Sequence, residues 1–370
     1  RADRGFVPIA GSGALVFTGS LDGAGHVIDG LYIKSAGNAR VGLIGSGNNA
    51  TVRRLSLTNV SIDGGDGSQV GAVMGQQSGG AIEDVDVTGS VVGGNNTGGV
   101  VGYVSSNGTV SNARSAATVM NMGVAAYSAG GVVGYMSSGL VQGSLASGNV
   151  TARNYAGGLA GLMLGNIVDS AATGTVEGQI AGGLVGAISL GSVVQSYATG
   201  SVTAVQSGGG LVGVLSSGFI SDAYAMGAVS GGGSAGGLVG QSDGTVQNSY
   251  ATGYVYGSGV KGGLIGNATS GTGVVISSYW NTATSGQATS SGGGTALTTA
   301  QMQGILLPGF DPSIWSTGAG LYPYLQWQFA AGETPKAVSG TVTGAGGAVA
   351  GLPLRQPVQH SPALMVNLLG

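Results

Sequence analysis

Cysteine is absent from this sequence and charge is scarce, and each shortage excludes a class of protein or site. Without cysteine the chain can form neither a disulfide framework nor a thiolate metal site. Only 7% of its 370 residues are charged, and 11 Lys and Arg with a net charge of −3 offer no basic surface for nucleic acid. No stretch of about 18 residues stays apolar, so we expect no transmembrane helix.

Glycine is what the sequence has in excess, with 79 residues. Many glycines lie in a five-residue box of two small residues, two apolar residues and a closing glycine. The box is clearest at residues 182–186, 209–213, 236–240 and 262–266, and looser copies end at Gly45, Gly75, Gly102, Gly134 and Gly161. The intervals between closing glycines run from 25 residues (Gly161 to Gly186) to 32 residues (Gly102 to Gly134). Recurrence at this period predicts a stacked solenoid.

Two further segments repeat with the box. The second segment of each unit carries an apolar residue at one position: Val52, Ile82, Val110, Val141, Ile167, Val193, Ile220, Val246 and Val275. The third segment places valine in one column: Val91, Val119, Val150, Val176, Val202, Val229 and Val255. Short β-rich segments cannot bury a face alone, but parallel stacking gives them a shared core. We predict an all-β fold, a right-handed single-stranded parallel β-helix of about 9–11 turns of ~27 residues.

The repeats also divide the chain. We expect residues 1–35 to form an N-terminal opening rung or cap, residues 36–282 the β-helix, and the aromatic-rich residues 283–330 a C-terminal cap. Within that cap, Thr298 is expected to N-cap a short helix. Residues 331–370 are interpreted as a linker and the start of a further β-rich segment or tail. No apolar region of a signal peptide follows the first residues, so we expect the chain to be part of a longer protein.

Parallel stacking aligns equivalent positions of successive turns into ladders. One ladder is polar in all but one copy, and we interpret it as a corner whose side chains tolerate turn conformations: Arg54, Asp84, Asn112, Gly143, Asp169, Gln195, Asp222, Asn248 and Ser277. Its carboxylates alternate with amides, so no metal site is predicted. Arg53 and Arg54 align with Glu83 and Asp84, which we interpret as ion pairing on a solvated face rather than a binding patch.

Tyrosine fills one column of four consecutive turns, Tyr197, Tyr224, Tyr250 and Tyr279. Alternation with small residues predicts that the rings point outward. They form either an exposed strip that binds sugar rings or a protein partner, or a self-stacked row that shields one face.

Asp169 and Asp222 share a column two turns apart, roughly 9–10 Å by strand spacing. That separation lies near the upper end of the range for an inverting glycosidase pair. No third charged group lies beside them, and His26 and His360 lie at opposite ends of the chain, so no Ser-His-Asp arrangement is visible. We therefore predict no catalytic residue, no enzyme activity and no cofactor.

The two apolar columns of the box leave one structural question open. Strict strand alternation would send one of them outward, as in Leu184 and Val185. Either glycine bends the chain so that both face the core, or the rod carries a long apolar stripe.

The box followed by Gln195–Gly200 or Asn248–Gly253 resembles the GLUG repeat of bacterial surface proteins. Phe17–Leu31 looks like the segment that opens such arrays, and Tyr279–Met302 with Tyr322–Leu325 looks like their closing segment. The resemblance covers about residues 5–330, although the Tyr-Ala-Thr-Gly signature is missing before Tyr197. Such arrays occur in large exported proteins similar to filamentous haemagglutinin, many of them two-partner secretion adhesins. The resemblance implies an extracellular β-helical shaft with an adhesive surface, and it brings no catalytic residues.

We therefore expect a non-catalytic structural or adhesive segment, extracellular or on the bacterial outer cell surface. Its partner would be a host-cell or matrix glycan or protein, or another copy of the same protein. Two alternatives stay open. One is a carbohydrate-binding or polysaccharide-degrading β-helix that uses the tyrosines or Asp169 and Asp222, and the other is a self-assembling extracellular fibre subunit.

Overall fold

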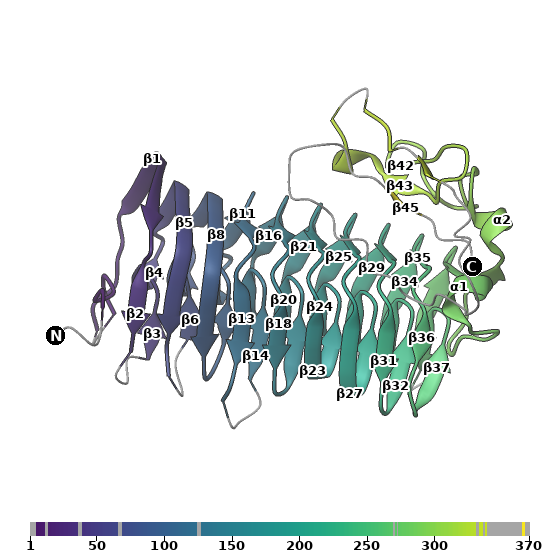
Figure 1. Ribbon diagram of the computed structural model, residues 1–370, viewed down its shortest axis with the longest axis horizontal. Coiled ribbons are helices and arrows are strands. Elements are labelled where there is room, and N and C mark those ends of the chain that lie inside the picture. The colour runs from purple at the N-terminus through teal and green to yellow at the C-terminus, as the bar shows by residue number, and fades with distance from the viewer. Residues whose placement is uncertain are drawn as a thin grey trace, which may run out of the picture. The chain divides into compact units, whose positions relative to one another are not determined.

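The computed structural model describes residues 5–11, 14–35, 39–65, 69–123, 127–268, 271, 273–330 and 333–335, with the backbone of 337–338 and 365–366. Contacts divide the chain into two units, residues 1–297 and 298–370. The first unit is the predicted parallel β-solenoid, in which equivalent strands stack turn on turn along one axis (Figure 1).

One parallel sheet of the solenoid contains nine strands, one from each box, which gives nine turns. These strands are β4 (Ile44–Asn48), β7 (Met74–Ser78), β10 (Val101–Ser105), β15 (Val133–Met136), β20 (Ala160–Met163), β24 (Val185–Ile188), β28 (Val212–Leu215), β33 (Val239–Ser242) and β38 (Ile265–Asn267).

The other strands of the solenoid belong to a sheet of 32 strands. The second segment of each turn contributes two sets of strands. The first set is β11 (Thr109–Ser111), β16 (Leu140–Gln142), β21 (Asn166–Val168), β25 (Ser192–Val194), β29 (Phe219–Ser221), β34 (Thr245–Gln247) and β39 (Val274–Ile276). The second set is β12 (Arg114–Ser115), β17 (Leu145–Ala146), β22 (Ala171–Ala172), β26 (Tyr197–Ala198), β30 (Tyr224–Ala225), β35 (Tyr250–Ala251) and β40 (Tyr279–Asn281).

The third segment contributes β2 (Tyr32–Lys34), β13 (Thr118–Asn121), β18 (Val150–Ala152), β31 (Val229–Gly231) and β36 (Val255–Tyr256). Strands leading into the box are β3 (Arg40–Val41), β6 (Gln69–Gly71), β9 (Thr97–Gly98), β14 (Ser128–Gly130), β19 (Tyr155–Gly157), β32 (Ser234–Gly236) and β37 (Val260–Gly262). Five strands run through two segments: β1 (Ser20–Asp29), β5 (Thr51–Asp63), β8 (Ala81–Gly93), β23 (Val176–Gly182) and β27 (Val202–Gly209).

The predicted apolar columns form the core. The second-segment column from Val52 to Val246 is fully buried, and only its last member, Val275, is partly exposed. The third-segment valines are buried as well, and those from Val119 to Val255 line a second, smaller cluster. Cα partners such as Val193 and Ile220 lie side by side in parallel register, as predicted.

Both apolar columns of the box face the core. Leu184 and Val185, like their equivalents in the other turns, are fully buried in the main cluster. The chain bends at Gly183 and Leu184, and β24 begins at Val185, so the two side chains belong to different walls of the same turn. The prediction of a glycine-assisted bend is confirmed, and the alternative of an exposed apolar stripe is wrong.

The glycine positions of the box cannot hold a side chain, because backbone atoms of neighbouring walls and turns approach them too closely. At residues 209–213, a Cβ on Gly209 would collide with the Val212 carbonyl oxygen, and one on Gly210 with the Gly237 carbonyl oxygen. A Cβ on Gly213 would lie 2.5 Å from the Gly186 carbonyl oxygen. The glycines thus let neighbouring walls and turns pack closer than any side chain would allow.

Trp280 ends the regular turns of the rod. It occupies the column in which earlier turns have the small, buried Ala198, Ala225 and Ala251. Its Nε1 donates to the Gln287 carbonyl oxygen at 3.0 Å. Helix α1 (Thr282–Ser285) and strand β41 (Thr295–Leu297) follow, and β41 pairs with β40. The first part of the predicted C-terminal cap therefore belongs to the solenoid unit.

The second unit is small and irregular. It contains α2 (Thr299–Met302), the antiparallel pair β42 (Trp315–Ser316) and β43 (Tyr324–Leu325), and the 3₁₀ turn η1 (Gln326–Gln328). The predicted N-cap is confirmed, because Thr298 and Gln301 form a reciprocal capping box. Strand β44 (Ala337–Val338) pairs with β45 (Met365–Val366). The rest of the strand expected from residue 337, and most of the predicted linker and tail, lie outside the described residues.

Candidate functional site

The polar ladder occupies a left-handed corner in every turn. All nine residues from Arg54 to Ser277 have a positive φ, between 42° and 59°. Asp, Asn and Gly tolerate this region more readily than other residues. The interpretation of the ladder as a corner is confirmed. Asp169 and Asp222 therefore have a structural role as corner residues.

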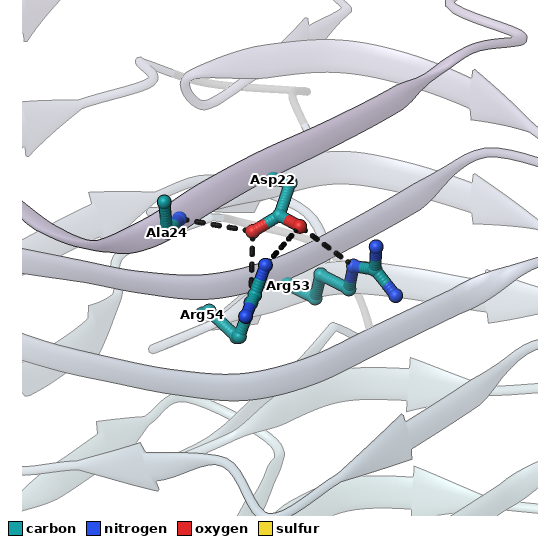
Figure 2. A network of polar contacts seen from close by, with 4 residues as sticks. All are labelled: Asp22, Ala24, Arg53 and Arg54. Atoms are coloured by element: carbon teal, nitrogen blue, oxygen red, sulfur yellow. Dashed lines mark hydrogen bonds and ion pairs between the residues drawn. The ribbon is translucent and has the colours of Figure 1, made fainter.

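A charged cluster lies on the first two turns (Figure 2). Asp22 on β1 accepts hydrogen bonds from Arg53 Nε at 3.1 Å, Arg54 Nε at 2.9 Å and the Ala24 N–H at 2.9 Å. The Arg54 hydrogen bond, and after it the Ala24 hydrogen bond, hold the pKa of Asp22 well below its usual range. The side chains are partly exposed, so the cluster is a solvated surface network.

The partners of these arginines differ from those expected. Arg53 lies beside Glu83 in the strand register, as predicted. The ion pairs found among the described residues nevertheless run to Asp22 of the preceding turn. One carboxylate can accept from both guanidinium groups, because Arg54 sits at the corner and turns back toward it.

The four candidate tyrosines lie in one column, but they do not form an exposed strip. Their alanine neighbours belong to the main core cluster and the tyrosines do not, so the rings leave the strand on the other side. Tyr197 stacks on Tyr224 at 5.0 Å, and Tyr224 on Tyr250 at 5.2 Å, with ring planes within 8°. Tyr224 is 1%, Tyr250 0% and Tyr279 7% exposed, and Tyr197 is half-buried.

The expectation of exposed rings is therefore wrong for Tyr224, Tyr250 and Tyr279. The rings of Tyr197, Tyr224 and Tyr250 cover each other's faces, and all four tyrosines have further interaction partners. Burial also raises the pKa of Tyr279. The self-stacked alternative describes this column better.

Asp169 and Asp222 sit at the same corner, with Gln195 between them. Burial raises the pKa of Asp169, and a hydrogen bond with Gln142 opposes that shift. Asp222 is buried and accepts a hydrogen bond from Ser221 Oγ, which in turn accepts one from Gln247. These contacts bind both carboxylates into the corner.

A buried serine ladder, which the sequence reasoning missed, runs beside this corner. Ser196 Oγ accepts from the Ser170 N–H at 3.1 Å and donates to the Val194 carbonyl oxygen at 2.8 Å. The same pair of hydrogen bonds recurs at Ser144, Ser170, Ser249 and Ser278. The signal in the sequence is a serine one place after the corner residue in each of these turns.

Exposed aromatic side chains were missed as well. Tyr254 lies directly before β36 (Val255–Tyr256), and Tyr256 lies on it. Their side chains are exposed, Tyr254 at 57% and Tyr256 at 44%. The signal was an aromatic residue on each side of a core valine in the third segment.

The described part of the chain contains no group of three or more His, Asp or Glu residues that could hold a metal ion. It also contains no helix with the length and apolarity needed to cross a membrane.

No protein family model matches the chain. Halomucin of Haloquadratum walsbyi is 41% identical over 90 residues, which is 24% of this chain and 1% of that protein. Among solved structures, a Bacteroides ovatus protein suggested to be an immunoglobulin A1 protease matches 87% of this chain and 81% of its own, with 20% identity and a TM-score of 0.45. The β-solenoid is established by the strand register of this chain itself.

Proposed function

We propose that this chain is a non-catalytic structural and adhesive segment of an extracellular protein on the bacterial cell surface. It serves as a rigid shaft that carries a contact surface. The observation that supports this proposal most is the unbroken parallel register of nine strands from β4 to β38. The candidate carboxylates are held by hydrogen bonds at the corner, and the candidate tyrosines are held by stacking. We therefore assign the contact surface for a partner to the outer faces of the strands.

Two likenesses support the extracellular placement. One is the match to halomucin, a mucin by name, over a small part of that protein. The other is the resemblance of the repeats to GLUG arrays of filamentous-haemagglutinin-like adhesins. The resemblance to these adhesins supports a partner that is a glycan or a protein of a host cell or matrix.

Bead adhesion tests the contact role. Beads coated with the chain should adhere to epithelial cells or to a matrix protein layer more strongly than beads coated with its heat-unfolded form. Equal adhesion of both beads would contradict an adhesive surface built by the fold.

A degradation assay tests the non-catalytic part of the proposal. The chain is incubated with a panel of polysaccharides, and we expect no release of reducing ends. Release that disappears in Asp169→Asn or Asp222→Asn would overturn this part and support the polysaccharide-degrading alternative.

Self-assembly is the second candidate, and the first rung favours it. Exposed apolar side chains gather there: Phe6, Val7, Ile9, Leu15, Val16 and Val27. Strand β1 pairs with β5, and no other described strand pairs with its outer edge. Such an edge is a template for another strand. Sedimentation across a concentration series should then show association that Val27→Lys weakens, and a concentration-independent monomer would exclude this candidate.

A further inference from the structure

We propose that Tyr254 and Tyr256 form a binding subsite for a neutral sugar ring at the C-terminal end of the rod. The inference rests on the proposed function as a contact surface and names the ligand class of one place on it. Among the described tyrosines, only Tyr32, Tyr254 and Tyr256 are exposed. Tyr254 and Tyr256 flank the buried Val255, so both rings project from the same outer face of the strand.

The two rings stack on each other, and together they keep about half of their surface exposed. Their centroids lie 5.6 Å apart and their planes differ by 17°. This stack runs along a single strand, whereas the Tyr197–Tyr224–Tyr250 stack runs between turns and is buried. The Tyr254–Tyr256 pair keeps large apolar faces in water, which marks a contact site.

The neighbouring turns leave space beside the rings. Ser230 is the register partner of Tyr256, and Thr203 is the partner of Ser230 in the turn before. The corresponding neighbours of Tyr254 are Ala228 and Ser201, through backbone hydrogen bonds of the same register. All four side chains are small, so the rings stand above a floor that presents three hydroxyl groups.

The residues around the tyrosines hold them in place. Gly286 lies against Tyr254, where an added Cβ would be 3.1 Å from Cε2. Lys261 Nζ donates to the carbonyl oxygens of Gly257 and Gly259, both at 3.1 Å, and ties down the turn after Tyr256. The Gln287 amide donates to the Val255 carbonyl oxygen at 2.9 Å. A site built in advance loses less conformational entropy when a ligand binds.

The chemistry of this place fits a neutral sugar. The C–H bonds of a pyranose face carry partial positive charge, which the negative face of an aromatic ring attracts. Ser230, Thr203 and Ser201 can exchange hydrogen bonds with sugar hydroxyls. Lys261 is committed to backbone oxygens, and the next charge along the column is the carboxylate of Glu177. A neutral sugar needs no salt bridge to bind here, and the Glu177 carboxylate disfavours an anionic polymer.

The test is affinity electrophoresis of the whole chain in native gels that contain dextran, xyloglucan or galactomannan, with alginate as the anionic comparison. We expect at least one neutral polysaccharide to retard the wild type. The double variant Tyr254→Ser, Tyr256→Ser should bind at least about tenfold more weakly, because it loses both aromatic rings. Tyr32→Ser removes an equally exposed tyrosine at the other end of the same sheet and is the matched control. Far-UV circular dichroism and the melting temperature confirm that each variant is folded.

Three results would overturn the subsite: no retardation by any neutral polysaccharide, equal binding by the double variant, or an equal loss in Tyr32→Ser. The bead assay separates this failure from that of the proposed function. Wild-type beads that adhere to periodate-oxidised cells, and lose adhesion with the double variant, would assign the tyrosines to a protein partner and exclude a glycan. Adhesion that the double variant retains leaves the contact role intact, while loss of all wild-type adhesion contradicts the proposed function itself.

Discussion

At the scale of the residue, the serine ladder shows how a solenoid satisfies the backbone at its sharpest corner. The positive-φ residue turns the chain, and the serine after it supplies an acceptor for the N–H of the preceding turn. A buried N–H without a partner costs about 1–3 kcal/mol. Each serine is therefore a small but repeated contribution to the stability of the rod.

Ser196→Ala should lower the free energy of unfolding by about 1–3 kcal/mol, because it removes the acceptor of the Ser170 N–H. Urea unfolding followed by circular dichroism measures this change. Ser201→Ala, at an exposed position in the same turn, is the control and should change little. Equal stability of Ser196→Ala and wild type would show that the ladder is not needed.

Asp22 gives a pH prediction. Its pKa is lowered below the usual 3.8 by Arg54 and Ala24, so its contribution to stability is present above that value and is lost as the pH falls. Asp22→Asn should therefore lower the urea midpoint at pH 7 and make it less sensitive to acid below about pH 5, where the Asp22 carboxylate of the unfolded chain begins to take up protons. Since the cluster is exposed, the effect should shrink in high salt. A parallel decline of both proteins with falling pH would refute this assignment.

At the scale of the element, the box is a corner made by close approach. Gly210 lies opposite Ala225, and an added Cβ would be 2.9 Å from the alanine Cβ and would collide with the Gly237 carbonyl oxygen. The Gly237 carbonyl oxygen belongs to the bend of the next turn and Ala225 to strand β30, so relief of the collision would shift the backbone. The two small residues of the box and the alanine of the Tyr-Ala pair are thus one packing unit, although they are about half a turn apart in the chain.

Gly210→Ala should destabilise the rod by about 3 kcal/mol or more, since the collision is with backbone atoms. Thr203→Ala, on an exposed position of the same turn, is the control. Thermal unfolding of both variants measures the difference. A melting temperature of Gly210→Ala that matches the control would contradict the close-packing account.

At the scale of the whole molecule, the solenoid unit contains its own continuous core. Each turn packs against its neighbours alone, so stability is close to a sum of turn and interface contributions. The last turn is closed by Trp280 and residues 286–297 of the same unit. The second unit has a separate set of buried aromatic contacts, such as Phe310 with Trp315.

A fragment of residues 1–297 should therefore fold without the second unit. Circular dichroism should show a β-rich spectrum and a cooperative melt. A fragment that ends at Ala251 also lacks Trp280 and the closing strands. It should be less stable, because the buried side chains of its last remaining turn become exposed. An unfolded 1–297 fragment would show that the solenoid depends on the second unit.

The period, the parallel stacking, the core columns and the corner could all be predicted from the sequence, because each rests on a local preference repeated turn after turn. Valine and isoleucine recur where a strand faces inward, and Asp, Asn or Gly recur where the backbone needs a positive φ. The exposure of the outward-pointing side chains could not be predicted in this way. Tyr224 and Tyr256 both point away from the core, yet one is buried and the other exposed. Alternation sets the direction of a side chain, whereas its exposure depends on what else packs against that face. For the same reason the partner of Arg54 could not be predicted, since two turns offer it a carboxylate and the geometry of the corner selects Asp22.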